Sequence, residues 1–242
     1  MELQKLLSKA RRAVEDYGMI EEGDKIAVGL SGGKDSVALL FVLATMKRFY
    51  PANFDLVAVF VDTGLGVDEE EVAEMKNLCE TLGVPFEVEK TLIGRIVFYE
   101  RKEKNPCSLC ANMRRGALNN AAKRLGCNKV ALGHHADDLV ETLFLSLFYE
   151  GRLATFAPVT KLGRQKLTVI RPMIYIAEKE TAAFAKDKPR IKNPCPADKH
   201  TKREYIKSLI KELGKDNPKL KENVLGAITH PNRNSLFPSG NA

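Results

Sequence analysis

The segment KIAVGLSGGKDSVALL, residues 25–40, decides how this chain folds. It begins with a short apolar run, continues with a turn rich in glycine and serine, and leads into apolar residues at helical spacing. This order predicts a buried strand, a sharp turn and a helix. Such a turn brings backbone N–H groups and a helix N-terminus against an anion. We therefore expect residues 31–36 to bind phosphate, with further donors from Ser31, Lys34 and Ser36 and with Asp35 placed to orient Mg²⁺.

The rest of the chain continues the same alternation of strands and helices. Further strands are expected at residues 54–62, 85–90 and 129–134, and helical patterns lie between them. Such an order favours right-handed crossovers and a doubly wound α/β fold, a parallel sheet covered on both faces. Ligands of these sheets bind beyond the carboxyl ends of the strands. Residues 159–172 predict a hairpin that turns at Gly163 and Arg164.

Three parts of the chain are predicted. Residues 1–22 carry an N-terminal helix with one apolar face, residues 23–172 form the α/β domain, and residues 173–242 form a small helical appendage.

The composition is typical of a globular protein, with 44 % hydrophobic and 29 % charged residues among 242. No apolar stretch reaches the roughly 20 residues that a membrane span needs. The first residues also lack the apolar core of a signal peptide. We therefore expect a cytoplasmic protein with no membrane partner. The net charge of +7 suits a polyanionic partner but does not identify one.

A second polar motif, GHHADD (residues 133–138), follows the strand predicted at 129–134. Its side chains should emerge at the same sheet edge as the phosphate-binding turn. Asp137 and Asp138 are suited to hold Mg²⁺ or to accept a proton, and Asp138 is the favoured one. The alternative is a helix start at which acidic residues complement the helix dipole. His134 and His135 are expected to pack or to form hydrogen bonds.

The five cysteines fall into two groups. Cys79 lies in a helical pattern, Cys127 follows Leu125 and Gly126 at a helix end, and both are expected to be buried. Cys107 and Cys110 form a C-x-x-C, and Cys195 repeats the N-P-C frame of Cys107 far downstream. Three interpretations fit these residues: a zinc site completed by His200, a redox or persulfide pair, and an iron–sulfur cluster held by three thiolates. The spacing alone leaves all three open.

Longer motifs carry a resemblance to known families. SGGKDS after the first strand resembles the signature of the PP-loop ATP pyrophosphatases, whose fold is Rossmann-like. NPCSLCANMRRGAL, LGHHADDLVETLFLSLFYEGRL and VIRPMIYIAEKE are similar to the tRNA 2-thiocytidine synthetase family over nearly the whole chain. The resemblance implies an enzyme that adenylates a base oxygen in tRNA with ATP and replaces it with sulfur, giving 2-thiocytidine at position 32.

The resemblance also implies site residues and partners. A [4Fe–4S] cluster would be bound by Cys107, Cys110 and Cys195, and Mg²⁺ by Asp35 and Asp138. Lys34 and Arg114 would stabilise phosphate charge. A sulfur donor, either a cysteine desulfurase or free sulfide, and a homodimer are expected. The implied ATP contacts are Val28, Gly29, Leu30, Ser31, Gly32, Gly33, Lys34, Asp35, Ser36, Val61 and Gly133.

One departure from the family and several basic clusters bear on the substrate. Many family members have a second cysteine shortly after the third ligand, whereas this chain reads CPADKHTKRE, so the modified base is open to question.

Lys and Arg are dense at 101–104, 114–124 and 186–203, and Phe98 and Tyr99 beside the first cluster are candidates for stacking on a base. The rivals are a lysidine synthetase-type ligase, a 2-thiouridine-forming relative and a zinc-bound RNA-binding module.

Overall fold

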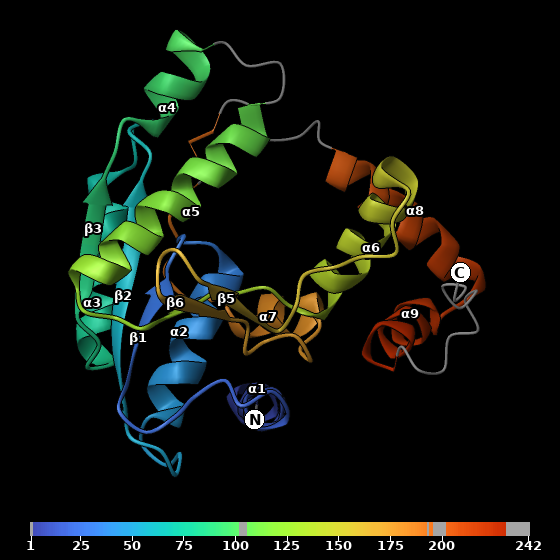
Figure 1. The fold of residues 1–242 in the computed structure, drawn as a ribbon, viewed down its shortest axis with the longest axis horizontal. Coiled ribbons are helices and arrows are strands. Elements are labelled where there is room, and N and C mark those ends of the chain that lie inside the picture. The colour runs from blue at the N-terminus through green and yellow to red at the C-terminus, as the bar shows by residue number, and fades with distance from the viewer. Residues whose placement is uncertain (1, 102–105, 193, 196–201, 231–242) are drawn as a thin grey trace. The chain divides into compact units, whose positions relative to one another are not determined.

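The computed structural model describes residues 2–101, 106–192, 194–195 and 202–230. Within these residues, six strands form one sheet in the order β3-β2-β1-β4-β6-β5 (Figure 1). Neighbouring strands are parallel except for β5 and β6, which are antiparallel. The strands are β1 (Asp24–Gly29), β2 (Phe54–Asp62), β3 (Phe86–Lys90), β4 (Lys129–Ala131), β5 (Val159–Leu162) and β6 (Leu167–Ile170).

Helices connect the strands and cover the sheet. In the described part of the chain they are α1 (Glu2–Asp16), α2 (Lys34–Met46), α3 (Glu69–Thr81), α4 (Ile93–Arg95), the π-helical turn η1 (Ile96–Glu100), α5 (Pro106–Arg124), α6 (Ala136–Glu150), α7 (Glu178–Phe184), α8 (Lys202–Asp216) and α9 (Leu220–Thr229).

The core explains why these residues form a sheet with two covered faces. The central strands β1, β2 and β4 are almost continuously buried, as expected for parallel strands. Alternate residues such as Ala27, Val59 and Val130 pack with Leu118 and Ala121 of α5 on one face. Helix α2 packs on β1 and β2, and α1, α2 and α7 contact one another (Figure 1). The prediction of a doubly wound α/β fold is confirmed.

The predicted hairpin is also confirmed. Val159 pairs with Ile170 and Leu162 pairs with Leu167, so the chain turns between them at residues 163–166. Strand β5 lies at the edge of the sheet, and this antiparallel pair follows directly after the parallel part.

The chain forms two compact units. The first spans Met1–His135 and Ala157–Asp198 and contains the whole sheet. The second spans Ala136–Phe156 and Lys199–Ala242 and contains α6, α8 and α9, with Val140, Ile206 and Ile210 in its small core. The predicted domain boundaries at 22/23 and 172/173 stay predictions. In the described residues, no helix has the length and apolar character needed to cross a membrane.

Candidate active site

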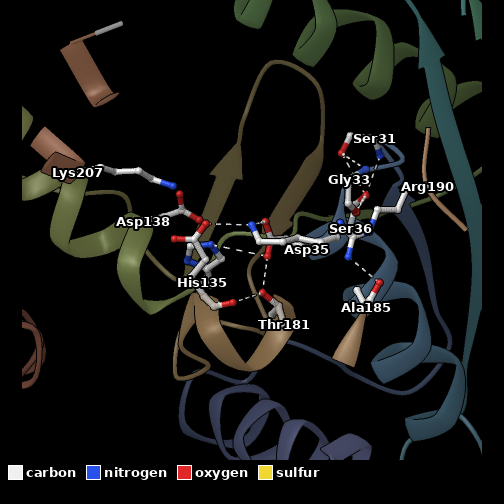
Figure 2. A network of polar contacts seen from close by, with 12 residues as sticks. Ser31, Gly33, Asp35, Ser36, His135, Asp138, Thr181, Ala185, Arg190 and Lys207 are labelled. Atoms are coloured by element: carbon white, nitrogen blue, oxygen red, sulfur yellow. Dashed lines mark hydrogen bonds and ion pairs between the residues drawn. The ribbon is translucent and has the colours of Figure 1, made fainter. Parts of the chain in front are cut away.

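The phosphate loop, residues 30–36, joins the carboxyl end of β1 to α2. The Leu30 N–H donates to the Val59 carbonyl at 2.9 Å, which fixes the start of the loop on β2. The Ser36 hydroxyl accepts from the Ser31 N–H at 3.1 Å and donates to the Gly33 carbonyl at 2.9 Å (Figure 2). Both predicted serine donors therefore brace the loop itself. No side chain caps α2 at Gly33, so its first-turn N–H groups form the kind of site that binds anions.

Lys34 lies between two carboxylates at the start of α2. Its ammonium is 2.9 Å from Asp35 Oδ2 and 3.0 Å from Glu178 Oε1, the latter from the first turn of α7. Burial alone would lower the pKa of Lys34, but hydrogen bonds to Asp35 and Glu178 outweigh burial and raise it. Lys34 therefore carries its positive charge at the phosphate loop throughout the neutral pH range.

The other carboxylate oxygen of Asp35 faces two further residues. Asp35 Oδ1 accepts a hydrogen bond from the Thr181 hydroxyl at 2.5 Å, and His135 Nε2 lies 3.8 Å from the same oxygen. Figure 2 shows Asp35 between His135 and Thr181. His135 is buried, in agreement with its predicted packing role. These contacts fix the orientation of the Asp35 carboxylate.

Gly133 lies directly against the phosphate loop. A Cβ at this position would be 3.1 Å from the backbone C and O atoms of Asp35 and 3.2 Å from the N atom of Ser36. A larger residue would therefore push on the first turn of α2. The structure brings the segment after β4 against the loop after β1, as expected for two neighbouring parallel strands.

The residues predicted to hold the adenosine form the strands behind the loop. The side chains of Val28, Leu30 and Val61 are buried in the core, so only their backbone atoms remain for such a contact. Gly29 is held close to Leu118 and Leu132, since a Cβ there would lie 3.0 and 3.1 Å from their side chains. Their roles as nucleotide contacts stay predictions.

Asp137 and Asp138 begin α6 and belong to the second unit. Asp138 Oδ1 is 2.8 Å from the guanidinium of Arg203 on α8. Asp137 Oδ1 is 2.5 Å from the ammonium of Lys221 on α9. Both carboxylates thus have cationic partners within their own unit. The part of Asp138 in binding Mg²⁺ stays a prediction.

The three candidate cysteines lie in the first unit, and two of them affect the pKa of the third. Cys107 is exposed near the start of α5, while Cys110 and Cys195 are partly buried. Burial raises the pKa of Cys110, Arg114 opposes that rise, and Cys195 and Cys107 add to it. The fold therefore brings Cys195 within electrostatic reach of the C-x-x-C, together with the positive charge of Arg114.

The two remaining cysteines are buried, as predicted. Cys79 and Cys127 are both buried, and burial raises the pKa of the Cys79 thiol to about 12.

His200, the fourth ligand of the zinc hypothesis, lies outside the described residues. Among those that are described, no three His, Cys, Asp or Glu side chains converge on the position of a single metal ion.

Sequence reasoning missed Glu178 and Thr181. Both lie on α7; Glu178 is part of the motif VIRPMIYIAEKE (residues 169–180) and Thr181 follows it directly, yet no residue of that motif was assigned a role. The signal was an acidic residue and a threonine three positions apart at a helix start. That spacing places both on one helix face, but only the tertiary fold shows that this face meets Lys34 and Asp35.

The candidate RNA contacts differ in whether they are packed in the core, paired with acidic residues or exposed. Phe98 packs against the core, whereas Tyr99 on η1 is 71 % exposed. Arg124 pairs with Glu87 and Glu89 of β3, so its charge is largely compensated. Among these residues, Tyr99 retains the exposure that stacking on a base requires.

Comparison with known proteins identifies the family. A family model for the PP-loop domain matches residues 2–213. A tRNA-cytidine(32) 2-sulfurtransferase from Pelobacter propionicus is 40 % identical over 227 residues, covering 91 % of this chain and 84 % of that protein. This chain belongs to the tRNA-cytidine(32) 2-sulfurtransferase family. A further member from Geobacter sulfurreducens is 39 % identical over 230 residues, covering 93 % and 89 % of the two chains.

A solved structure supports the fold of this member of the tRNA-cytidine(32) 2-sulfurtransferase family. The U34-tRNA thiolase NcsA from Methanococcus maripaludis, solved with its [4Fe-4S] cluster, superimposes with a TM-score of 0.76. It covers 98 % of this chain and 81 % of the thiolase at 23 % identity. The predicted family, fold class and sulfurtransferase enzyme class are confirmed. The roles of individual site residues stay predictions.

Proposed function

We propose that this chain is a cytoplasmic, ATP-dependent tRNA thiolase that adenylates the 2-oxygen of cytidine 32 and replaces it with sulfur. The activity for which its relatives are named supports the substrate and the product, and these relatives align with nearly the whole chain. The observation that carries the proposal is that one compact unit holds both a glycine-rich loop at an uncapped helix N-terminus and the three cysteines Cys107, Cys110 and Cys195. The two features serve the two halves of such a reaction.

The phosphate loop is proposed to bind the triphosphate of ATP. The first-turn N–H groups of α2 and the charged ammonium of Lys34 offer donors and positive charge to the phosphates. When the base oxygen attacks the α-phosphorus, an O–P bond forms and the bond to pyrophosphate breaks. Lys34 and Arg114 are proposed to stabilise the charge that accumulates on the phosphate oxygens.

Asp35 is the best-supported carboxylate for Mg²⁺ binding. Thr181 fixes one of its oxygens, and the other lies beside Lys34 at the loop. Carboxylate oxygens are suitable ligands, because Mg²⁺ prefers hard oxygen donors and keeps several waters. Asp138 is proposed as the second carboxylate on the basis of the family resemblance.

The three cysteines are a fitting donor set for an iron–sulfur cluster. Thiolates are the ligands that such clusters use, and Cys110 responds electrostatically to both Cys107 and Cys195. Cys107, Cys110 and Cys195 would hold the cluster, and the cluster would supply sulfide to the activated base. In the second half-reaction a C–S bond to sulfide forms, the C–O bond breaks and AMP leaves, with no net oxidation of the base. The sulfur donor is proposed to be a cysteine desulfurase or free sulfide.

The proposed partner is tRNA, and Tyr99 is the proposed stacking residue. Tyr99 lies on η1, next in sequence to the segment that leads into α5 and its cysteines. Stacking on an aromatic ring is a common way to hold an unpaired base, and it is tolerant of base identity. A homodimer is expected from the family resemblance and stays a prediction.

The decisive experiment measures metal content and product together. Protein purified without oxygen is analysed for iron, sulfide and zinc, and is then incubated with tRNA, ATP, Mg²⁺ and sulfide. We expect iron and sulfide in the protein, pyrophosphate release that depends on tRNA, and 2-thiocytidine in the nucleoside digest. A tRNA with uridine at position 32 should give no 2-thiocytidine.

Single cysteine variants provide the matched comparison. Cys107→Ala, Cys110→Ala and Cys195→Ala should each abolish thiolation, whereas Cys127→Ala, which changes a buried cysteine outside the triad, should retain it. Full thiolation by any of the three triad variants would overturn the cluster role. Zinc without iron, with no pyrophosphate release, would favour an RNA-binding module, and 2-thiouridine or an amine adduct would favour the other two rivals.

A further inference from the structure

A short irregular segment after α7 crosses the phosphate loop. We call residues 190–192 the strap. The Ile191 N–H donates to the Gly32 carbonyl at 3.1 Å, and the Ile191 side chain is buried. The contact is so close that a Cβ on Gly32 would lie only 2.4 Å from Ile191 Cβ. The middle of the strap therefore lies directly on the phosphate loop.

Each neighbour of Ile191 is anchored to a different element. The Arg190 guanidinium donates to the Ala185 carbonyl at 2.7 Å, just past the end of α7 (Figure 2). The Lys192 N–H donates to Glu71 Oε2 at 2.8 Å, and Glu71 lies in the first turn of α3. Three consecutive residues thus join the end of α7, the phosphate loop and the start of α3.

The contact with Glu71 is mainly a backbone contact. The Lys192 ammonium lies 3.3 Å from Glu71 Oε1, but the Lys192 side chain is 91 % exposed, so this ion pair contributes little. The Glu71 side chain is only 16 % exposed and directs a carboxylate oxygen at a backbone N–H. A charge-assisted bond of this kind is stronger than a neutral one, and it fixes the backbone rather than a side chain.

The strap leads to the third candidate cysteine. Cys195 follows Lys192 by three residues, a length of chain that spans at most about 10 Å. Anchoring the Lys192 backbone therefore restricts the volume that the Cys195 thiol can occupy. Cys107 and Cys110 belong to the same compact unit as the strap and Cys195, so the tether and the C-x-x-C are parts of one body.

We propose that Glu71 is a positioning residue that holds the strap and thereby keeps Cys195 beside Cys107 and Cys110. This inference rests on the proposed function, since it assumes that the three thiols act together. Glu71 would act through its hydrogen bond to the Lys192 backbone. Its role is to hold the backbone from which Cys195 extends.

The test measures the accessibility of Cys195 in protein without a cluster. Native protein is treated with iodoacetamide under anaerobic conditions, and alkylation of Cys195 relative to Cys107 is followed by mass spectrometry of peptides. In Glu71→Ala we expect Cys195 to react about tenfold faster than in the wild type, because a hydrogen bond to a charged group is lost. Glu71→Gln keeps an acceptor for the Lys192 N–H and should restore most of the protection.

Two controls separate positioning from a general effect on α3. Glu70→Ala removes an exposed acidic residue from the same first turn, so it reproduces the change in helix-dipole interaction and should leave Cys195 protected. Lys192→Ala removes the exposed ammonium but keeps the backbone N–H, and it should also resemble the wild type. Equal alkylation of Cys195 in wild type and Glu71→Ala would overturn the proposal, as would an equal increase in Glu70→Ala.

A second readout follows the reconstituted protein. Glu71→Ala should lose iron to a chelator about tenfold faster than the wild type or Glu70→Ala, for the same reason. Wild-type protein that never binds iron would refute the cluster in the proposed function, yet the alkylation comparison would still test the strap. The two failures are therefore distinguishable.

Discussion

Replacement of Gly32 by alanine tests whether the strap and the phosphate loop are packed as tightly as the structure indicates. Gly32 has φ of +78°, and a Cβ there would meet Ile191 Cβ at 2.4 Å and the Ile191 backbone N at 3.0 Å. A non-glycine residue in this left-handed region costs about 1–2 kcal/mol. Overpacking of a closed site costs about 1–3 kcal/mol more. We therefore expect Gly32→Ala to lower the free energy of unfolding by about 2–5 kcal/mol.

Gly66 offers a matched control. Its φ is +84°, close to that of Gly32, but a Cβ there would meet nothing within 4 Å. Gly66→Ala should therefore lose only the conformational part, about 1–2 kcal/mol. The difference between the two variants isolates the contact with Ile191.

Urea unfolding measures both variants under the same conditions. With a slope of about 2–3 kcal/mol per molar urea, Gly32→Ala should lower the midpoint by about 1–2 M, and Gly66→Ala by less than about 1 M. ATP affinity, measured by calorimetry, should fall in Gly32→Ala alone, because the strap and the loop must move apart. Equal losses of stability in the two variants would refute the argument that Ile191 presses on the loop.

Three further perturbations test two parts of the site and one buried cysteine of α3. Glu178→Gln should tighten Mg²⁺-free ATP binding about two- to fivefold, because Lys34 would no longer have to leave the Glu178 carboxylate in order to bind phosphate. Lys34→Met should weaken ATP binding. Calorimetry that shows weaker ATP binding in Glu178→Gln would contradict the competition between Glu178 and phosphate for Lys34. Gly133→Ala should lower the free energy of unfolding by about 1–3 kcal/mol and weaken ATP binding, since the new Cβ would press on the Asp35 backbone. An unchanged midpoint of urea unfolding in this variant would argue against this contact. Burial raises the pKa of the Cys79 thiol from 9.0 to about 12. The contribution of the protonated thiol to the free energy of unfolding is therefore present below pH 9 and is lost as the pH rises toward 12. Across that range, the free energy of unfolding should depend less on pH in Cys79→Ala than in the wild type.

The local pattern was sufficient to predict the fold class. Residues 25–46 contain an apolar run, a glycine turn and a helical repeat, and each of these depends on backbone preferences within a few residues. The hairpin was predicted for the same reason, because Gly163 lies between two short β-prone runs. The burial of Cys79 followed from its place in a helical pattern, and that of Cys127 from its place just after a helix end.

The composition of the site was only partly accessible from the sequence. SGGKDS and the C-x-x-C are local motifs, so their residues could be selected without a structure. Glu178 and Thr181 were not selected, because they are more than 140 positions from the residues they contact. A glutamate and a threonine on a short helix have no periodicity that distinguishes a partner of the phosphate loop from a solvated surface.

The sequence by itself therefore determined the order of strands and helices, the phosphate loop and the identity of the candidate ligands. These features depend on local backbone preference and on the chemistry of individual side chains. Only the tertiary structure decided that Lys34 forms ion pairs with both Asp35 and Glu178. It also decided that the strap, three residues before Cys195, forms hydrogen bonds with both Gly32 and Glu71. Apart from the pair of neighbours Lys34 and Asp35, those contacts join residues far apart in the chain, and they form only when packing of the whole sheet and its helices brings the segments together.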